Sequence, residues 1–204
     1  MKTAWFLTHR IREAMRDGSL APMGGAGQTV EADETFIGRK LGVPVRTGGH
    51  HKNAVLTLVE RGGSARSFHV EKATVAEIAP IVRDNLARES HLMTDEAAHY
   101  ARLGREFANH STVDHGREEY GYTDRKTGFN ANTNTVEGYY SIFKRGMIGV
   151  YQHCSEKHLH RYLAEFDFRY SNRVKLGVDD VARADRALAG VKGKRLTYQT
   201  IGQL

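Results

Sequence analysis

Residues 28–37 read QTVEADETFI, and this stretch decides the fold. Apolar and polar residues alternate along it, which is the period of a half-buried β-strand. One side of the extended chain would carry Val30, Ala32 and Phe36, and the other side would carry Glu31 and Asp33. The alternation therefore predicts a strand with Asp33 on its polar face.

Two more strands are expected after this one. NAVLTLVE (53–60) and ARSFHVE (65–71) are separated by Arg-Gly-Gly-Ser, a pattern typical of a β-hairpin. The intervening run GRKLGVPVRTGGHHK (38–52) is basic and rich in glycine and has no period, so it predicts a mobile loop near Asp33.

The rest of the chain predicts helices alternating with short strands, and then helices alone. Thr74 and Glu77 form a capping-box pattern before a helical period. Residues 90–94 form a short strand that ends at Asp95, and a small strand is expected near 111–113. After a polar loop (114–134) come helices at about 135–144, after Ser155, and at 179–188. The expected order is β-β-β-α-β-α-β-α in a mixed α/β fold, with a helical C-terminal third.

The N-terminal segment is predicted to be an appendage. Residues 3–17 have a helical period that ends at Gly18, and GSLAPMGGAG (18–27) has the composition of a flexible linker. We expect three parts: a helix and linker (1–27), a catalytic-type domain (28–175) and a C-terminal helical tail (176–204).

Composition narrows the class of protein. The 204 residues carry a net charge of +6, and that surplus lies in residues 138–204, where 12 basic residues face 6 acidic ones. No apolar run is long enough for a membrane helix, and no signal peptide is present, so a cytoplasmic protein is expected. The single cysteine, Cys154, excludes an intrachain disulfide and multi-cysteine zinc sites. Charge alone does not decide whether this basic surplus binds a polyanionic partner, such as nucleic acid, or is only a solvated surface.

Three acidic residues could form a metal site. Asp33 lies on a strand, Asp95 ends another, and Glu137 falls in the first turn of a helix. Adjacent strands and a helix packed across them can bring such carboxylates together, and their repulsion would then require a divalent cation such as Mg²⁺. By spacing alone the signal is weak, because an acidic residue at a strand end is more often a solvated cap. Lys144, two helical turns after Glu137, could reach a phosphate or could be a surface charge.

Four ordered blocks carry a family resemblance. VEADETFIG (30–38), HLMTDEAAHY (91–100), NTNTVEGYYSIFKRG (132–146) and SEKHLHRYLAEFDFRYSNR (155–173) resemble the catalytic domain of small bacterial insertion-sequence transposases of the DDE type, which have a ribonuclease H-like core. The resemblance implies that Asp33, Asp95 and Glu137 bind two Mg²⁺ or Mn²⁺ ions and that Lys144 is an additional active-site lysine.

The resemblance also implies double-stranded DNA as the partner, namely transposon ends and target, and a homo-oligomer assembled on that DNA. Metal-dependent cleavage and strand transfer are the implied reactions. The predicted DNA-binding residues lie in the basic loop (38–52) and at the end of the helix expected at about 135–144. They are Arg39, Lys40, Lys52, Lys144 and Arg145.

Departures from the family leave alternatives open. Relatives carry a cysteine-rich zinc ribbon ahead of the segment resembling residues 3–15, and this sequence has no cysteine before Cys154, so a truncated or internally started copy is expected. Such a remnant could bind DNA without specificity or interfere with assembly instead of catalysing transposition. A host nuclease of the ribonuclease H type is a third alternative, although no feature prefers RNA.

Other reactive side chains have ordinary explanations. The pair His50–His51 is expected to be solvated or to contact phosphate, and Cys154 to be a bystander. The histidines His153, His158 and His160 are expected at the surface near nucleic acid or at a domain interface. Tyr139 and Tyr140 replace an aromatic–tryptophan pair of the relatives and could stack on a flipped base, although one of them is expected to pack in the core.

Overall fold

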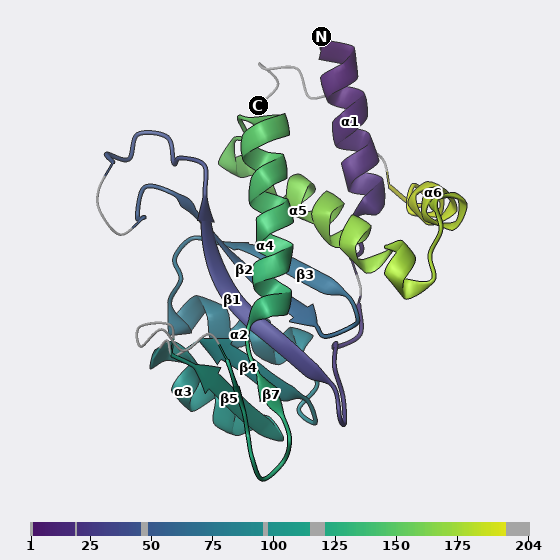
Figure 1. The fold of residues 1–204 in the computed structure, drawn as a ribbon. Helices are drawn as coiled ribbons and strands as arrows, with labels where there is room; N and C mark the ends of the chain where they lie inside the picture. Colours follow the sequence, from purple (N-terminus) through teal and green to yellow (C-terminus); the bar gives the residue numbers. More distant parts are fainter. Residues whose placement is uncertain (1, 19, 46–48, 96–97, 115–120, 195–204) are drawn as a thin grey trace.

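A five-stranded mixed sheet forms the centre of the protein (Figure 1). The computed structural model describes residues 2–18, 20–45, 49–95, 98–114 and 121–194. The strands of this sheet are β1 (Thr29–Ile37), β2 (Asn53–Glu60), β3 (Ala65–Val70), β4 (His91–Asp95) and β5 (Asn109–Val113). Their spatial order is β3-β2-β1-β4-β5, so the first strand of the chain lies in the middle of the sheet.

Strand direction changes at β1. It pairs antiparallel with β2, which pairs antiparallel with β3, whereas β1–β4 and β4–β5 are parallel. Each parallel step requires a crossover, and helices α2 (Val75–Asn85) and α3 (Ala98–Leu103) supply these connections. The predicted order of strands and helices is confirmed from β1 to β5, and the mixed α/β fold class is confirmed.

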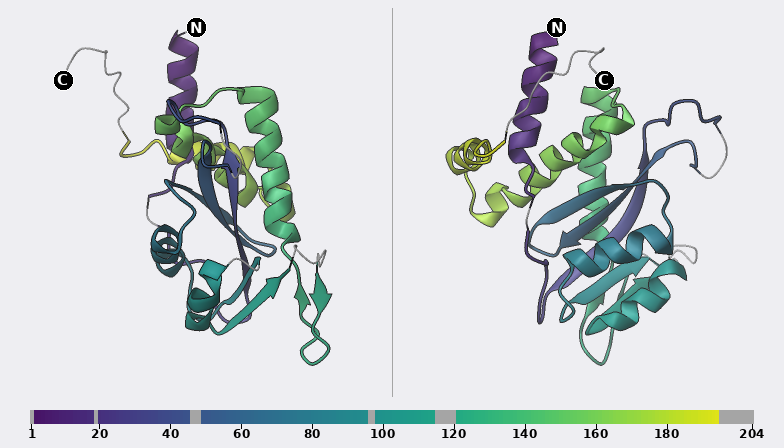
Figure 2. Two further views of the ribbon diagram at one scale, coloured as in Figure 1. Left: turned by 90° about the vertical axis from the view of Figure 1, so that its left-hand side faces the viewer. Right: turned by 180° about the vertical axis from the view of Figure 1, so that it is seen from behind.

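Helices cover both faces of the sheet. On one face α2 packs on even-numbered residues of β1 such as Val30 and Ala32. On the other face α4 (Asn134–Gly146) and α5 (Glu156–Ser171) pack on Ile37 and on residues of β2. Figure 2 shows α2 and α3 on the side away from α4. The two apolar clusters therefore lie on opposite sides of the sheet.

Strand β1 is buried more completely than its alternation predicts. A half-buried strand would expose its polar face, but Glu31 has no exposed surface and Thr35 is also buried. Instead Phe36, on the expected apolar side, is 40% exposed. The prediction fails because β1 is a central strand and α4 lies across its polar face.

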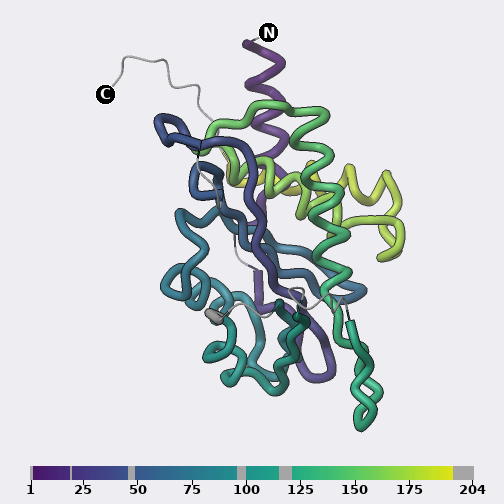
Figure 3. Tube along the Cα trace, turned by 60° about the vertical axis from the view of Figure 1, so that its left-hand side comes forward, coloured from purple at the N-terminus to yellow at the C-terminus, as the bar shows by residue number. Residues whose placement is uncertain are grey.

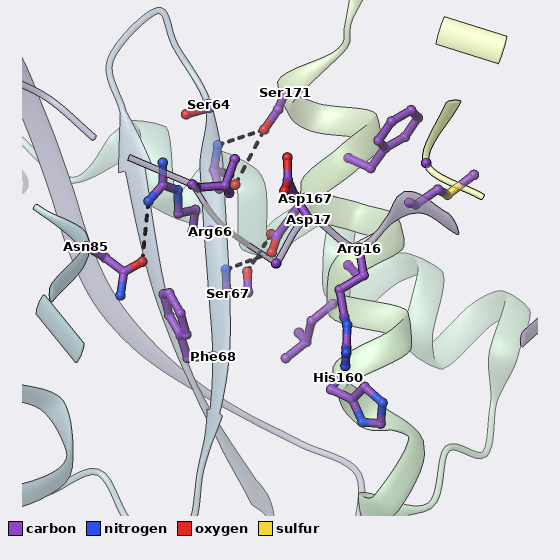
Figure 4. A pocket seen from close by; sticks show the side chains of 18 of the residues that line it. Arg16, Asp17, Ser64, Arg66, Ser67, Phe68, Asn85, His160, Asp167 and Ser171 are labelled. Atoms are coloured by element: carbon purple, nitrogen blue, oxygen red, sulfur yellow. Dashed lines mark hydrogen bonds between the residues drawn. The ribbon is translucent and has the colours of Figure 1, made fainter. Parts of the chain in front are cut away.

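The outer edge of β3 is covered by α5, as Figure 4 shows. The backbone N–H of Ser67 donates to Asp167 Oδ2 at 2.8 Å, and that of Ala65 donates to Ser171 Oγ at 3.0 Å. Unpaired strand edges invite pairing with other chains. Side chains of α5 therefore satisfy edge groups of β3 that a sixth strand would otherwise bind.

The segment before β1 does not form a free linker. Met23 is buried, and it exchanges backbone hydrogen bonds with the end of α2, from Met23 N to Asn85 O and from Ala87 N to Met23 O. A glycine is required at 24, where φ is +81° and a Cβ would meet Ser90. The chain is therefore fixed to the end of α2 at Met23 and Gly24, within the segment predicted as a flexible linker.

Helix α1 (Lys2–Met15) packs against α5 and against α6 (Asp180–Ala189). Two ion pairs join α1 to α5: Arg12 with Glu165 at 2.8 Å and Glu13 with Arg161 at 2.7 Å. Because both pairs are largely shielded from solvent, α1 is held firmly to the helical layer.

A small hairpin precedes α4 within the segment predicted as a polar loop. Its strands are β6 (Tyr122–Thr123) and β7 (Asn130–Ala131), and Figure 3 shows it projecting from the body. After α4 the chain makes a π-helical turn (Met147–Tyr151), and single 3₁₀ turns occur at Gly104–Glu106 and Val174–Leu176. Among the described helices, none has the length and apolar character needed to span a membrane.

Candidate active site

Asp33 and Asp95 lie on neighbouring parallel strands. The register pairs Thr29 with His91 and Glu31 with Met93, an offset of 62 residues. The pairing ends at Glu31 and Met93, and Asp33 and Asp95 each follow by two residues, so they keep the same offset. Residues paired in this way point to the same face of a sheet, so both carboxylates belong to the face covered by α4.

Glu137 reaches this face from the first turn of α4. Thr133 is the N-cap residue, and its hydroxyl donates to Glu137 Oε1 at 2.8 Å. The Glu137 N–H donates to the Thr133 carbonyl at 3.1 Å. A carboxylate is favourable in this first turn because the helix dipole presents partial positive charge there.

Tyr140, one turn after Glu137, joins α4 to β1. Its buried hydroxyl donates a hydrogen bond to the carbonyl oxygen of Asp33. Tyr139 is also buried, and its hydroxyl donates to Asp167 at 2.6 Å. Both tyrosines therefore belong to the core, and the stacking of either on a flipped base is excluded in this conformation.

The acidic residues interact electrostatically. The pKa of Asp33 is raised to about 7, mainly by burial and in addition by the negative charges of Glu34, Asp95 and Glu137, while a hydrogen bond from the Glu34 N–H opposes the shift. Glu34 itself lies on the opposite face of β1, where the buried Tyr100 hydroxyl donates to it. Asp33 therefore sits where negative charge is costly unless a cation compensates it.

The donor set suits a hard divalent cation. Carboxylate oxygens are the ligands that Mg²⁺ and Mn²⁺ prefer. Among the described residues, no three His, Cys, Asp or Glu side chains gather closely enough to hold one ion together. An arrangement of two ions does not require this, because each ion can take ligands from a different pair of carboxylates.

The predicted DNA-binding residues fall into two groups. Lys144 and Arg145 are exposed in the last turn of α4, and Lys144 Nζ lies 5.8 Å from the centre of the Tyr140 ring. Arg39 and Lys52 are exposed in the loop after β1, whereas Lys40 donates to the Glu71 carbonyl. Residues 46–48 of that loop lie outside the described residues. Figures 1 and 3 place the loop and the C-terminal end of α4 at the same end of the molecule.

Sequence reasoning missed Glu31 and Arg61. Glu31 was assigned only to a polar face, yet it is fully buried and its Oε1 accepts from Arg61 Nε at 2.7 Å. The available signal was weak: an acidic residue two positions before Asp33 and an arginine directly after a strand. Their partners lie far away in sequence, so spacing could not reveal the pair.

The remaining candidates take structural places. Burial raises the pKa of the Cys154 thiol to about 11, so the thiol stays protonated at neutral pH, as expected of a bystander. His158 packs its ring against Trp5 and His9, and His160 lies 3.4 Å from Glu13. These two histidines line the interface between α1 and α5. An interface was one of the two environments expected for them, the other being a surface near nucleic acid.

The strand order and the helices on both faces define a ribonuclease H-like α/β domain, with three acidic residues on β1, β4 and α4. Residues 24–171 match the family model of the ISXO2-like transposase domain. The chain belongs to this family, which confirms the resemblance found in the sequence.

No curated protein matches the chain. Among solved structures, the chain is similar to a chain of the simian T-cell lymphotropic virus intasome in complex with PP2A regulatory subunit B56 gamma. The identity is 14%, the TM-score is 0.39, and the likeness covers 73% of this chain and 51% of that one. The chain thus spans about half the length of that neighbour.

Proposed function

We propose that this chain is the catalytic domain of a DDE transposase that cleaves and joins insertion-sequence DNA ends in a metal-dependent reaction. Membership of the transposase domain family supports the class of reaction. The observation that carries the proposal is the offset of 62 residues in the β1–β4 register, which also separates Asp33 from Asp95 and supports a position of both on the face covered by α4.

In this proposal the three acidic residues hold two Mg²⁺ or Mn²⁺ ions. Asp33 and Asp95 would bind the ions from the two strands, and Glu137 would contribute a carboxylate to the second ion from α4. When bound, such ions activate a water or a 3′-hydroxyl for attack on a phosphodiester and stabilise the leaving oxygen. The raised pKa of Asp33 supports this role, because a buried carboxylate beside two others has a strong electrostatic need for a cation.

Lys144 binds the DNA backbone and does not ligate metal. A protonated amine has no lone pair for a metal, whereas it pairs readily with phosphate. Its exposure on the same helix as Glu137 supports this assignment, with Arg145 and the basic loop extending the contact. The DNA partner, assembly into a homo-oligomer and a cytoplasmic location are parts of the same proposal.

Nicking of supercoiled plasmid by the purified chain, with Mg²⁺ or Mn²⁺ and with EDTA, tests the function. We expect nicking only with the metal, and its loss in Asp33→Asn, Asp95→Asn and Glu137→Gln. Glu165→Gln is the matched control, since it removes a shielded carboxylate from the α1–α5 ion pair far from the triad. DNA binding without nicking under all conditions would support the inactive remnant instead.

A further inference from the structure

Glu31 is a fully buried carboxylate whose two oxygens are both occupied. Its Oε2 accepts hydrogen bonds from the backbone N–H groups of Thr135 (2.8 Å) and Val136 (2.9 Å) in the first turn of α4. Its Oε1 accepts from Arg61 Nε at 2.7 Å. Glu31 therefore caps α4 from another element, and both of its oxygens are engaged by groups of the protein.

Arg61 completes the connection from the turn between β2 and β3. Besides Glu31, its guanidinium donates to the carbonyl oxygens of Asn130 (2.7 Å) and Asn132 (2.6 Å), which lie just before α4. The guanidinium also lies over the Phe129 ring at 5.3 Å. One arginine thus holds both the capping carboxylate and the chain that enters the helix.

The pair stands next to two of the proposed metal ligands. Glu31 precedes Asp33 by two residues on the same face of β1, and Val136 directly precedes Glu137. The contacts join residues 104 and 105 positions apart, so they fix the start of α4 against β1 at the level of the site. A negative charge at a helix N-terminus with a buried partner is a strong, directional connection.

We propose that Glu31 and Arg61, here called the Glu31–Arg61 clamp, are positioning residues that set the separation of the Asp33 and Glu137 carboxylates. The proposal rests on the proposed function for its metal site. Neither residue touches the ions; both act through the placement of α4. Groups that orient metal ligands typically change metal affinity by roughly 10- to 100-fold when they are altered.

The test compares Glu31→Gln, Glu137→Gln and the double variant in the full chain. In the metal-free protein, we expect backbone amides of residues 134–140 to exchange at least about fivefold faster in Glu31→Gln, because the cap is weakened. In Mn²⁺ titrations followed by electron paramagnetic resonance, Glu31→Gln should weaken affinity by about 10-fold or more. Glu31→Gln should add little to Glu137→Gln, because a positioning residue acts only through its ligand.

Glu165→Gln is the matched control, because it also breaks a carboxylate–arginine pair that is shielded from solvent. It should lower stability without altering Mn²⁺ affinity or exchange in α4. If Glu31→Gln does not fold, Arg61→Lys replaces it, since a single ammonium cannot serve the carboxylate and both carbonyls.

The outcomes separate the two proposals. Two results would overturn the clamp. One is that amide exchange at residues 134–140 is the same in Glu31→Gln as in wild type. The other is that wild type binds Mn²⁺ and Glu31→Gln binds it with the same affinity. If wild type binds no Mn²⁺ while Glu31→Gln loosens α4, the metal site of the proposed function fails, and the clamp survives only as a support of the helix start.

Discussion

The hydroxyl of Tyr140 donates a hydrogen bond to the main-chain carbonyl of Asp33. This bond ties α4 to the central strand one helical turn after Glu137. The contact made by Glu31 lies just before Glu137 in the sequence. Two polar connections therefore flank Glu137 along α4, one at the helix start and one in the next turn.

Tyr140→Phe should lower the free energy of unfolding by about 1 kcal/mol, since a buried carbonyl loses its donor while the ring still fills its place. For a domain of this size the melting temperature should fall by about 2–4 °C. Thermal unfolding followed by circular dichroism measures this. Tyr122→Phe, on the exposed hairpin, is the control and should leave the melting temperature unchanged. Equal melting of both variants would contradict the assignment.

Asp33→Asn should stabilise the metal-free protein. The folded-state pKa of Asp33, about 7, lies above its ordinary value of 3.8. The free energy of unfolding of the metal-free protein therefore decreases as pH rises from about 4 to about 7, because the folded state resists ionisation of this group. Above about pH 7 the cost is at most about 4 kcal/mol, and the neutral amide removes much of it. Chemical unfolding in EDTA at pH 7.5 measures the gain.

Added Mg²⁺ should narrow the difference in stability between wild type and Asp33→Asn. Binding to the folded state stabilises wild type by about 2.7 kcal/mol at 100 times the dissociation constant, and Asp33→Asn should gain far less. A wild-type melting temperature that does not respond to Mg²⁺ or Mn²⁺ would count against a metal site at Asp33.

Asp167→Asn should flatten the dependence of stability on pH. Burial raises the pKa of Asp167 to about 6, although hydrogen bonds from Tyr139 and Ser67 oppose the shift. The folded protein thus binds this proton more tightly than the unfolded chain, and stability falls by up to about 3 kcal/mol as pH rises from about 4 to 6. Urea unfolding at pH 4.5 and pH 7 should show a smaller difference in the variant. Asp84→Asn, an exposed carboxylate in α2, should behave as wild type.

Lys144→Ala should weaken binding to duplex DNA and reduce the slope of log affinity against log salt by about 0.9, the value for one phosphate contact. Mn²⁺ affinity should not change. Fluorescence anisotropy across a salt series measures the slope, with Lys175→Ala, another exposed lysine, as control. An unaltered slope would remove Lys144 from the DNA interface.

The sequence by itself determined the order of the elements and the identity of the acidic candidates. The period-2 alternation around Asp33 is a local property and predicted the bounds of β1 closely, and the helix expected at about 135–144 corresponds to α4. The four ordered blocks predicted the family, which the match over residues 24–171 confirms. The roles of Asp33, Asp95, Glu137 and Lys144 stay predictions.

Only the tertiary structure decided which polar residues are buried and what compensates them. Glu31 and Asp33 look alike in the strand pattern, yet Glu31 is neutralised by Arg61 and by the start of α4, while Asp33 lies among other carboxylates. Likewise, the backbone of Met23, within a glycine-rich segment, pairs with the end of α2. The physical reason is the same in each case: a buried charge or backbone group is satisfied by partners distant in sequence, and local periodicity carries no information about them.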